Sequence, residues 1–336
     1  MRKKKKVSIE DVAHRANVSI TTVSRVINNV STVDPKIQAR VEEAITYLKY
    51  QPHISAQRLA RGLNNAVGLV MPGYPGIFHS FYAIELIRGI GHACETLRLD
   101  MVFHITNGFN PLNSNNVGGI IFADIIENRK QVEHTLEMGI PCMVINNIVQ
   151  DLDVSYVAID NKAGAVMATD YLFSLGHQKI AMITGNLKTQ GGFQRLEGFK
   201  ESIQKHNITL PDGYTYEGDY SRRCARQATE YFFNLKPAPT AIFASSDDMA
   251  LEAMSVVMEH GLKIPEDISV VGFDDNPASL YGSVALTTIR QPLFHMAESS
   301  VKHLNAMVLG KKKERVKVVL TPELVVRESC RPPKNP

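Results

Sequence analysis

The sequence predicts a small all-α head followed by a larger, two-lobed α/β core in which helices flank two parallel sheets. Residues 8–48 repeat apolar side chains at helical spacing between helix caps, which favours three short helices. From Ala66 onward, apolar runs typical of buried strands alternate with helical segments, as in parallel sheets covered by helices on both faces. The chain has 336 residues and more such units than one sheet comfortably holds, so two lobes with a cleft between them fit better.

Capping signals place the helices of the head. Ser8 is followed three residues later by an acid, the pattern of a capping box. Residues 17–19 (Asn-Val-Ser) interrupt this helix and supply a cap for the next one, on whose buried side we expect Val23 and Ile27. Residues 34–35 (Asp-Pro) begin the third helix, because proline suits its first position.

The core elements follow from apolar runs and helical periodicity. The predicted strands are Val67–Met71, Met101–Ile105, Gly119–Phe122, Cys142–Ile145, Lys179–Ile183, Thr240–Ala244, Ser269–Gly272 and Leu286–Ile289, with a strand-like closing tail at Val316–Val326. The predicted helices are Phe81–Thr96, Lys130–Met138, Ala163–Leu175, Arg195–His206, Arg226–Asn234, Asp247–His260 and Phe294–Leu309.

Charge is distributed unevenly between head and core. Residues 1–64 contain 12 Lys/Arg and 5 Asp/Glu, whereas the rest contains 25 Lys/Arg and 29 Asp/Glu. A basic head on an acidic body is typical of a polyanion partner for the head. For residues 2–6 alone a solvated lysine tail is the simpler interpretation, but basic residues continue as far as Arg61.

Several classes of protein are excluded by what the sequence lacks. No stretch approaches 18 consecutive apolar residues, and charged residues interrupt the place where a signal peptide would need its apolar region. We therefore expect a cytoplasmic, nucleoid-associated protein without a membrane partner. The four cysteines are scattered, which indicates neither a zinc site nor a disulfide framework. Nucleotide-binding loops and common catalytic motifs are missing, so we expect no cofactor, no metal and no enzymatic activity.

The two capped helices joined by a tight turn at 17–19 predict a helix-turn-helix, whose second helix enters the major groove of DNA. Its outward residues include Ile20, Thr21 and Arg25, of which the arginine can donate two hydrogen bonds to a guanine edge. The alternative is a structural three-helix bundle whose polar face is merely hydrated.

Motifs spread over nearly the whole chain resemble the lactose/galactose-repressor (LacI/GalR) family of transcriptional regulators. They are residues 7–13 (VSIEDVA), 16–19 (ANVS), 22–28 (TVSRVIN), 50–52 (YQP), 56–60 (AQRLA), 175–177 (LGH), 195–199 (RLEGF), 265–275 (PEDISVVGFDD), 286–289 (LTTI) and 324–329 (LVVRES). Each is weak alone, but their order and spacing together are specific. The resemblance implies a core like that of periplasmic binding proteins.

The resemblance also implies DNA-binding residues. They are Ser19, Ile20, Thr21, Thr22, Ser24, Arg25, Asn28 and Thr32 in the head, and Leu59 and Ala60 in a hinge helix. Leu59 falls where the family's hinge leucine wedges between base pairs, which costs unstacking energy but lets bent DNA contact more protein. The alternative for Leu59 is an ordinary residue of an amphipathic helix. His53 departs from the asparagine common in the family.

The resemblance implies a ligand site in the cleft. Its candidate residues are Tyr82, Asp160, Arg195, Tyr220, Ser246 and Asp274. Arg195 and Asp274 suit neighbouring hydroxyl groups of a sugar, because one donates and the other accepts hydrogen bonds. A structural salt bridge between the two lobes is the alternative for this pair, as core packing is for Tyr220. A second departure is that residues 106–116 are too short and too rich in turn formers for the family's helix, so we expect a loop there.

Together these observations predict a homodimeric repressor of a near-palindromic operator in double-stranded DNA, controlled by a small ligand, for which a sugar is the first choice and a purine the second. The alternatives are a solute-binding protein for sugar transport, against which the head argues, and an enzyme on a two-lobed scaffold. The predicted domains are a head at 1–50, a hinge with a short helix at 51–64, a core at 65–330 and a tail at 331–336. Within the core, the N-lobe takes about 65–160 and 292–321, and the C-lobe about 161–291 and 322–330.

Overall fold

The computed structural model describes residues 7–27, 33–50, 64–73, 77–124, 126–311 and 314–334. Four of the predicted DNA-binding residues, Asn28, Thr32, Leu59 and Ala60, lie outside these ranges, as do His53 and the predicted hinge helix.

The head contains the three predicted helices, α1 (Ile9–Ala16), α2 (Ile20–Ile27) and α3 (Pro35–Leu48). Ser8 closes the expected capping box with Asp11, and the Asp34 side chain accepts the backbone N–H of Lys36 at 2.8 Å to begin α3. The buried pair on α2 differs from the prediction.

Val23 and Val26, rather than Val23 and Ile27, are the buried residues of α2. Ile27 lies at the edge of the head core, half-buried against it. Both i+3 and i+4 neighbours share a helix face, so spacing alone did not show which of the two would be covered by α3.

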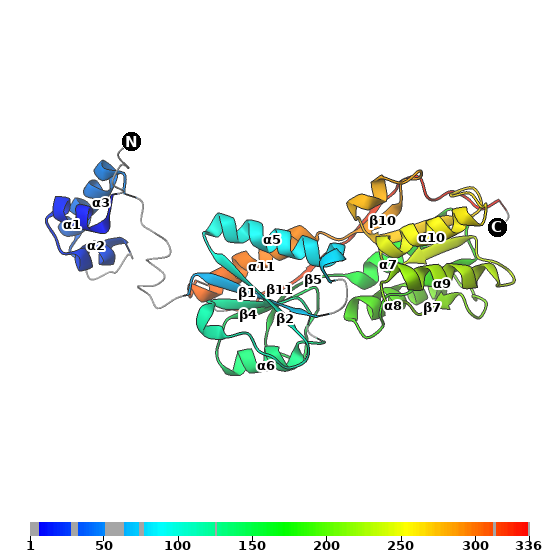
Figure 1. Ribbon diagram of the computed structural model, residues 1–336, viewed down its shortest axis with the longest axis horizontal. Helices are drawn as coiled ribbons and strands as arrows, with labels where there is room; N and C mark the ends of the chain where they lie inside the picture. Colours follow the sequence, from blue (N-terminus) through cyan, green and yellow to red (C-terminus); the bar gives the residue numbers. More distant parts are fainter. Residues whose placement is uncertain are drawn as a thin grey trace.

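The core consists of two six-stranded sheets, each flanked by helices (Figure 1). The first, sheet A, has the order β11-β5-β4-β3-β1-β2 and contains β1 (Ala66–Pro72), β2 (Asp100–Thr106), β3 (Gly119–Phe122), β4 (Cys142–Ile145), β5 (Ser155–Ile159) and β11 (Lys317–Leu320). The second, sheet B, has the order β12-β10-β9-β8-β6-β7 and contains β6 (Ile180–Ile183), β7 (Thr215–Tyr216), β8 (Ala241–Ala244), β9 (Ser269–Asp274), β10 (Thr287–Arg290) and β12 (Glu323–Val325).

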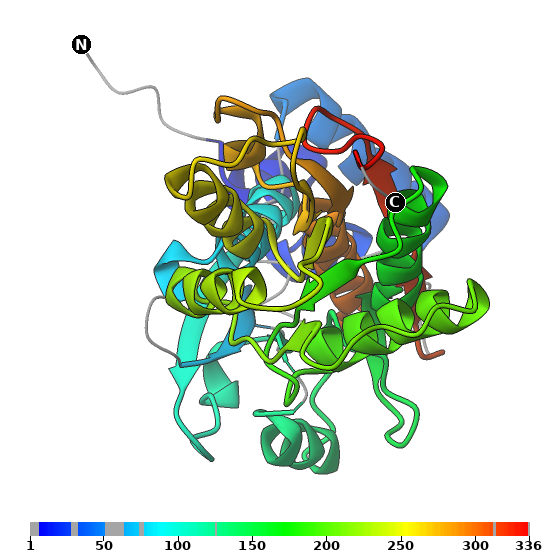
Figure 2. The ribbon, with the colours of Figure 1, turned by 90° about the vertical axis from the view of Figure 1, so that its right-hand side faces the viewer.

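Helices cover both faces of each sheet. Beside sheet A lie η1 (Ile77–His79), α5 (Phe81–Leu97), η2 (Ser114–Asn116), α6 (Arg129–Glu137) and α11 (Leu293–Val308); beside sheet B lie α7 (Asn161–Ser174), α8 (Gln190–Lys205), α9 (Arg222–Phe233), α10 (Asp247–Glu259) and η3 (Pro277–Leu280). In sheet A, α5 and α11 pack on one face and α6 on the other. In sheet B, α9 and α10 lie opposite α7 and α8 (Figure 2). Within the described residues no helix is long and apolar enough to span a membrane.

The chain crosses between the two sheets three times: from β5 into α7, from β10 into α11, and from β11 into β12. All strand pairs are parallel except β10 with β12, which runs antiparallel. The carboxyl ends of the parallel strands carry the residues that follow Ile159, Ile183, Ala244 and Phe273, which is where an open α/β sheet binds ligands.

Three details of the predicted core are corrected by the structure. Strands β5 and β7 were not predicted, although every residue of β5 is buried. The closing tail is two strands, β11 and β12, in different sheets, rather than one. Helix α8 begins at Gln190, so Arg195 lies inside the helix rather than at its start. Gly191 and Gly192 obscured this start, but Thr189 caps it by accepting the N–H of Gly192 at 3.1 Å.

The predicted loss of a helix between β2 and β3 is confirmed. The segment after β2 contains only the one-turn η2 before β3 begins. Leu112 from this segment lies over Gly68 of β1, where a Cβ atom on the glycine would approach the leucine side chain to 2.4 Å. The loop therefore covers, with one apolar side chain, part of the sheet face on which α6 packs.

His177 joins sheet B to the C-terminal tail, and its burial should make the stability of the core depend on pH. Its imidazole is almost fully buried and contacts the hydroxyls of Thr240 and Ser269 and the carbonyl of Arg331 at 2.9–3.0 Å. Burial lowers the pKa of His177 below its ordinary 6.5. As the pH falls, His177 is therefore protonated in the unfolded chain before it is protonated in the folded one. Its contribution to the free energy of unfolding is complete above pH 6.5 and decreases as the pH drops toward the pKa of His177 in the folded protein.

We expect His177→Gln to lose less stability than the natural chain on acidification from about pH 7.5 to 5.5, by roughly 1 kcal/mol. The measurement is the free energy of unfolding in denaturant at both pH values, with the exposed His14→Gln as the matched control. Equal acid losses in all three proteins would show that His177 does not titrate in this range.

Candidate DNA-reading face and ligand cleft

The outward face of α2 carries the predicted DNA-reading residues of the head. Ile20, Thr21 and Arg25 are exposed, and Ile20 leaves 47% of its surface uncovered. Ser24 is half-buried beside them. An isoleucine and an arginine exposed within two turns of one helix match the contacts that read a thymine methyl and a guanine edge.

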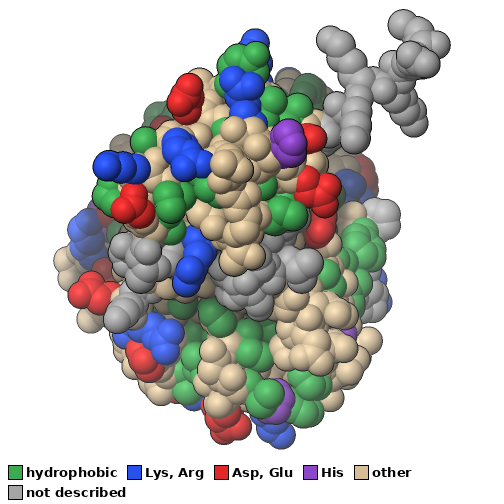
Figure 3. All heavy atoms as spheres, turned by 90° about the vertical axis from the view of Figure 1, so that its left-hand side faces the viewer, with side chains coloured by type: hydrophobic (Ala, Val, Ile, Leu, Met, Phe, Trp, Pro, Cys, Tyr) green, Lys and Arg blue, Asp and Glu red, His purple; other side chains and the backbone are tan. Residues whose placement is uncertain are grey.

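Ser19 and Thr22 are engaged within the helix itself. The Ser19 hydroxyl accepts the backbone N–H of Thr22 at 3.1 Å, which caps α2, and lies 2.8 Å from the Thr22 hydroxyl. These two residues therefore fix the start of the reading helix. Lysine and arginine side chains are spread over the end of the molecule that carries the head rather than gathered in one patch (Figure 3).

Arg40 of α3 holds the turn between α1 and α2. Its guanidinium donates to the carbonyl of Ala16 and, at 3.0 Å, to that of Asn17, where the left-handed backbone (φ 51°) ends α1. These carbonyls would otherwise lack partners at the helix end. Arg40 thus fixes the angle between the two helices of the motif from a third helix.

We expect Arg40→Met to destabilise the head by about 1–3 kcal/mol, because two carbonyls lose a charged donor. In the full chain this should speed amide exchange in α1 and α2 and weaken DNA binding without changing base preference. Lys36→Met removes the same charge from an exposed position of the same helix and is the control. Unchanged exchange in Arg40→Met would show that the turn holds without this residue.

Arg195 and Asp274 meet in the core, as predicted. Arg195 is only 4% exposed, and its Nη1 lies 3.9 Å from Oδ1 of Asp274. Its Nε donates to Oδ1 of Asn161 at 2.9 Å, its Nη1 donates to the carbonyl of Ser245, and the guanidinium lies 3.8 Å above the Phe273 ring. These contacts fix the arginine at the carboxyl end of sheet B.

Two further candidates, Asp160 and Ser246, are sequence neighbours of residues that bond to Arg195, and both act as helix caps. Asp160 precedes Asn161 and accepts the N–H of Ala163 at 2.9 Å, beginning α7. Ser246 follows Ser245 and accepts the N–H of Met249 at 3.3 Å, beginning α10. Their side-chain oxygens therefore stabilise the starts of α7 and α10, next to the two residues, Asn161 and Ser245, that bond to Arg195.

The surroundings of Arg195 contain buried polar atoms without partners among the described residues. They are Nδ2 of Asn161, Oγ of Ser245 and Oε1 of Gln291. Gln291 also donates from Nε2 to Oδ1 of Asp274 at 2.5 Å. Unsatisfied buried groups are costly and rare, and their gathering around one ion pair is typical of a site that a ligand or water completes. None of the three was predicted from the sequence.

Two of the acids at this end of sheet B, Asp274 and Asp247, have raised pKa values. Burial raises the pKa of Asp274 above its ordinary value, and nearby Arg195 opposes this rise. Burial also raises the pKa of Asp247, which is fully buried and accepts hydrogen bonds from the Asn276 N–H, at 2.7 Å, and the Thr288 hydroxyl. Carboxyl groups with raised pKa values in a cleft are typical of binding sites.

The two aromatic candidates lie apart from the Arg195 pair. Tyr220 has a left-handed backbone (φ 67°), and its ring covers Gly185, whose absent Cβ would lie 2.1 Å from it. Its hydroxyl is 3.4 Å from Thr189, the cap of α8. Tyr82, on the sheet A side, donates its hydroxyl to the Ala123 carbonyl at 2.6 Å.

Gln190 connects the two lobes directly. Its side-chain amide accepts the N–H of Ile148 at 2.7 Å and donates to the carbonyl of the same residue at 2.9 Å. Ile148 follows β4 of sheet A, and Gln190 is the first residue of α8 beside sheet B. The sequence carried no signal for this contact, because it depends on the approach of two distant segments.

A cavity of about 200 Å³ also lies where the lobes meet. Asp274, Asp275, Arg290 and Gln291 line it from one lobe, and α5 and α11 line it from the other. Among the described residues no three His, Cys, Asp or Glu side chains are grouped to hold a metal ion.

A three-helix head with an exposed reading helix, followed by two α/β lobes with a charged site between them, defines a ligand-controlled DNA-binding regulator. Residues 8–53 match the bacterial regulatory proteins of the lacI family, and residues 169–330 match the periplasmic binding protein-like domain. The chain is 31% identical to the probable HTH-type transcriptional repressor ExuR of Bacillus subtilis, over 97% of this chain and 98% of that protein.

Solved structures show the same similarity. A complex of the transcriptional regulator CelR with cellobiose superimposes with a TM-score of 0.71 at 27% identity, covering 96% of this chain and all of that chain. The lac repressor dimer bound to operator and the anti-inducer ONPF gives 0.71 at 27% identity, covering 97% of this chain and all of that one.

This chain belongs to the LacI family. It is a ligand-modulated transcriptional repressor rather than a solute-binding protein of a transport system, and members of the family are regulators rather than enzymes. The helix-turn-helix prediction and the two-lobed fold are confirmed, and the structural-bundle alternative for the head is wrong.

Proposed function

We propose that this protein is a homodimeric repressor that reads a near-palindromic operator through α2 and changes its operator affinity when a sugar binds beside Arg195 and Asp274. The observation that carries the proposal is the Arg195–Asp274 pair, set 3.9 Å apart at the carboxyl end of sheet B. A buried donor and acceptor at that spacing suit two neighbouring hydroxyl groups on one ring.

The surroundings of the pair support a polar ligand. The unpartnered groups of Asn161, Ser245 and Gln291 add two donors and an acceptor close to it. The similar CelR structure contains cellobiose. We therefore propose Arg195 and Asp274 as the central ligand contacts, with Asp160, Ser246, Tyr82 and Tyr220 as the outer wall.

The remaining assignments are also proposals. In the head, Ile20, Thr21, Ser24 and Arg25 would face the bases, with Ser19 and Thr22 fixing their helix. Two heads, presented by a dimer, would read the two half-sites. The similar lac repressor was solved as a dimer on its operator. The head, hinge and lobes would divide at the predicted boundaries, with the two lobes each centred on one of the two sheets.

Two experiments in series test the function. Purified full-length protein is first used to select sites from random duplex DNA at moderate salt; we expect a near-palindrome with two equal half-sites. A panel of neutral and acidic mono- and disaccharides is then tested for a change in affinity for that site, with purine bases as the second class. A purine that acts where every sugar fails would replace the sugar assignment, and salt-sensitive binding without a motif would contradict the reading role of α2.

A further inference from the structure

The turn that follows β9 is held in an unusual backbone conformation. Asp274 and Asp275 are consecutive non-glycine residues with positive φ, of 129° and 58°. Side chains larger than hydrogen rarely occupy this region, and it persists where the surrounding contacts hold it in place. The two carboxylates have different neighbours. Asp274 lies beside Arg195, whereas Asp275 bonds to two other arginines.

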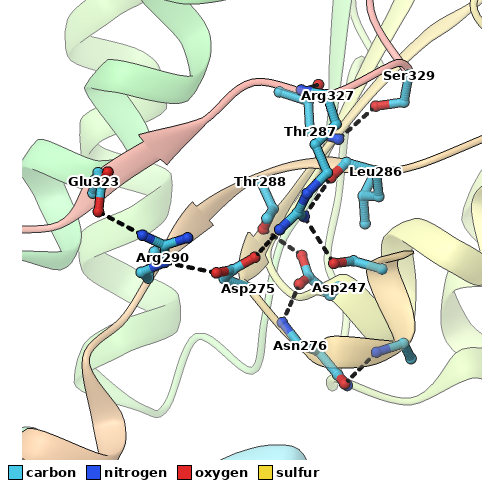
Figure 4. Close-up of polar contacts among 12 residues, drawn as sticks. Asp247, Asp275, Asn276, Leu286, Thr287, Thr288, Arg290, Glu323, Arg327 and Ser329 are labelled. Carbon is cyan, nitrogen blue, oxygen red and sulfur yellow. Dashed lines mark hydrogen bonds and ion pairs between the residues drawn. The ribbon is translucent and has the colours of Figure 1, made fainter. Parts of the chain in front are cut away.

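Asp275 forms ion pairs with both Arg290 and Arg327 (Figure 4). Nε of Arg290 donates to Oδ2 at 2.7 Å, and Nη2 of Arg327 donates to Oδ1. Arg327 is anchored in turn to the Ser279 hydroxyl and the Leu286 carbonyl, both at 2.8 Å. Burial alone would raise the pKa of Asp275, but the two arginines hold it below its ordinary value, so the carboxylate stays charged.

The same network holds two of the three crossings between the lobes. Arg290 is the last residue of β10, directly before the chain crosses at 291–292 into α11. Glu323 is the first residue of β12, directly after the crossing at 321–322 from β11. Arg290 donates from Nη1 to Oε2 of Glu323 at 2.8 Å (Figure 4), which ties the two crossings together. Asp275 is therefore bonded to an arginine that holds both.

We propose that Asp275 is a positioning residue that transmits a change at Asp274 to these two crossings, and so to the angle between the lobes. The inference rests on the proposed function in one respect, namely that Asp274 contacts the ligand. The mechanism follows from the strained turn, since Asp274 and Asp275 share one peptide unit, and a displacement of Asp274 that shifts this unit also reorients Asp275. Coupling of this kind requires an element that both sites bias.

The test needs neither operator nor ligand. Asp274→Asn removes the charge on the cleft side of the turn, and hydrogen exchange is followed in full-length protein for peptides covering 286–296 and 318–326. In the otherwise natural chain we expect Asp274→Asn to change exchange at both crossings by about threefold or more, as for residues in one network. In an Asp275→Asn background the response in 318–326 should disappear, whereas part of the response in 286–296 should remain, because Gln291 donates directly to Asp274. If Asp275 has only a structural role, Asp275→Asn should change the exchange rates themselves but leave the effect of Asp274→Asn on 318–326 intact.

Glu323→Gln sharpens the test, since this variant removes the charge that pairs with Arg290 but leaves the backbone pairing of β10 with β12 in place. It should keep the response in 286–296 and weaken it in 318–326. If Asp275→Asn does not fold, Arg290→Lys tests the proposal in its place. Lysine keeps the positive charge but lacks the planar guanidinium that bonds Asp275 and Glu323 at the same time. A response to Asp274→Asn in 318–326 that survives in both Asp275→Asn and Arg290→Lys, or that is missing from the natural chain, overturns the proposal. Such a result would leave the operator selection and sugar panel unaffected.

Discussion

Replacing Arg195 by alanine is expected to abolish the response to sugar and to lower the free energy of unfolding of the core by about 3–5 kcal/mol. The arginine is buried against Asp274, Asn161 and the Phe273 ring, so its loss leaves a buried acid without its cation and a buried amide without its partner. The measurements are denaturant unfolding and operator affinity with and without the sugar found in the panel.

Arg222→Ala is the matched control for this prediction. Arg222 also pairs with an acid beside sheet B, Glu252, at 2.9 Å, but 67% of its side chain is exposed. An exposed pair contributes about 0–1 kcal/mol, so this variant should stay near the natural stability and keep its sugar response. A response that persists in Arg195→Ala at unchanged sugar concentration would show that the ligand binds elsewhere.

Arg25→Ala is expected to weaken binding to the selected operator by about 1–3 kcal/mol, which is roughly 5- to 150-fold, and to relax the base preference at one position of each half-site. The physical reason is that Arg25 is exposed on α2, where its fork of donors can pair with a guanine edge. Binding is measured on the operator, on operators changed at single positions, and on unrelated DNA.

Lys36→Ala is the control for Arg25. It removes one positive charge from an exposed position on α3 without touching α2. A charge that contacts only phosphate should weaken binding evenly on all sequences and reduce its salt dependence. If Arg25→Ala behaves in this even way, the arginine positions the head on the backbone of DNA and does not read a base.

The head was the most predictable part of the protein because its signals are local. The Ser8 cap, the Asp34 cap and the break at Asn17 each depend on residues within four positions, and all three appear in the structure. The burial of Val26 in place of Ile27 was decided by α3, which the spacing on α2 does not contain.

In the core, elements of strong apolar periodicity were predicted to within a few residues, whereas short or divided ones were not. Strand β5 has only five residues and follows a loop with little periodic pattern. Residues 316–326 form two strands because the chain crosses between the lobes within this segment. Both halves have the residue pattern of a strand, so the sequence did not show where one strand ends and the other begins. The shortened 106–116 segment was predictable, since turn formers in a short span cannot form a helix.

The family motifs in the sequence were enough to predict the class of protein, and the same resemblance placed Arg195 and Asp274, far apart in the chain, in one site. The groups that complete this site became visible only in the folded core, because Asn161, Ser245, Gln291 and the Gln190–Ile148 contact depend on where distant strands end. It also placed Asp275 between Arg290 and Arg327. Periodicity and caps are properties of neighbouring residues, whereas hydrogen-bond partners are selected by the packing of whole lobes.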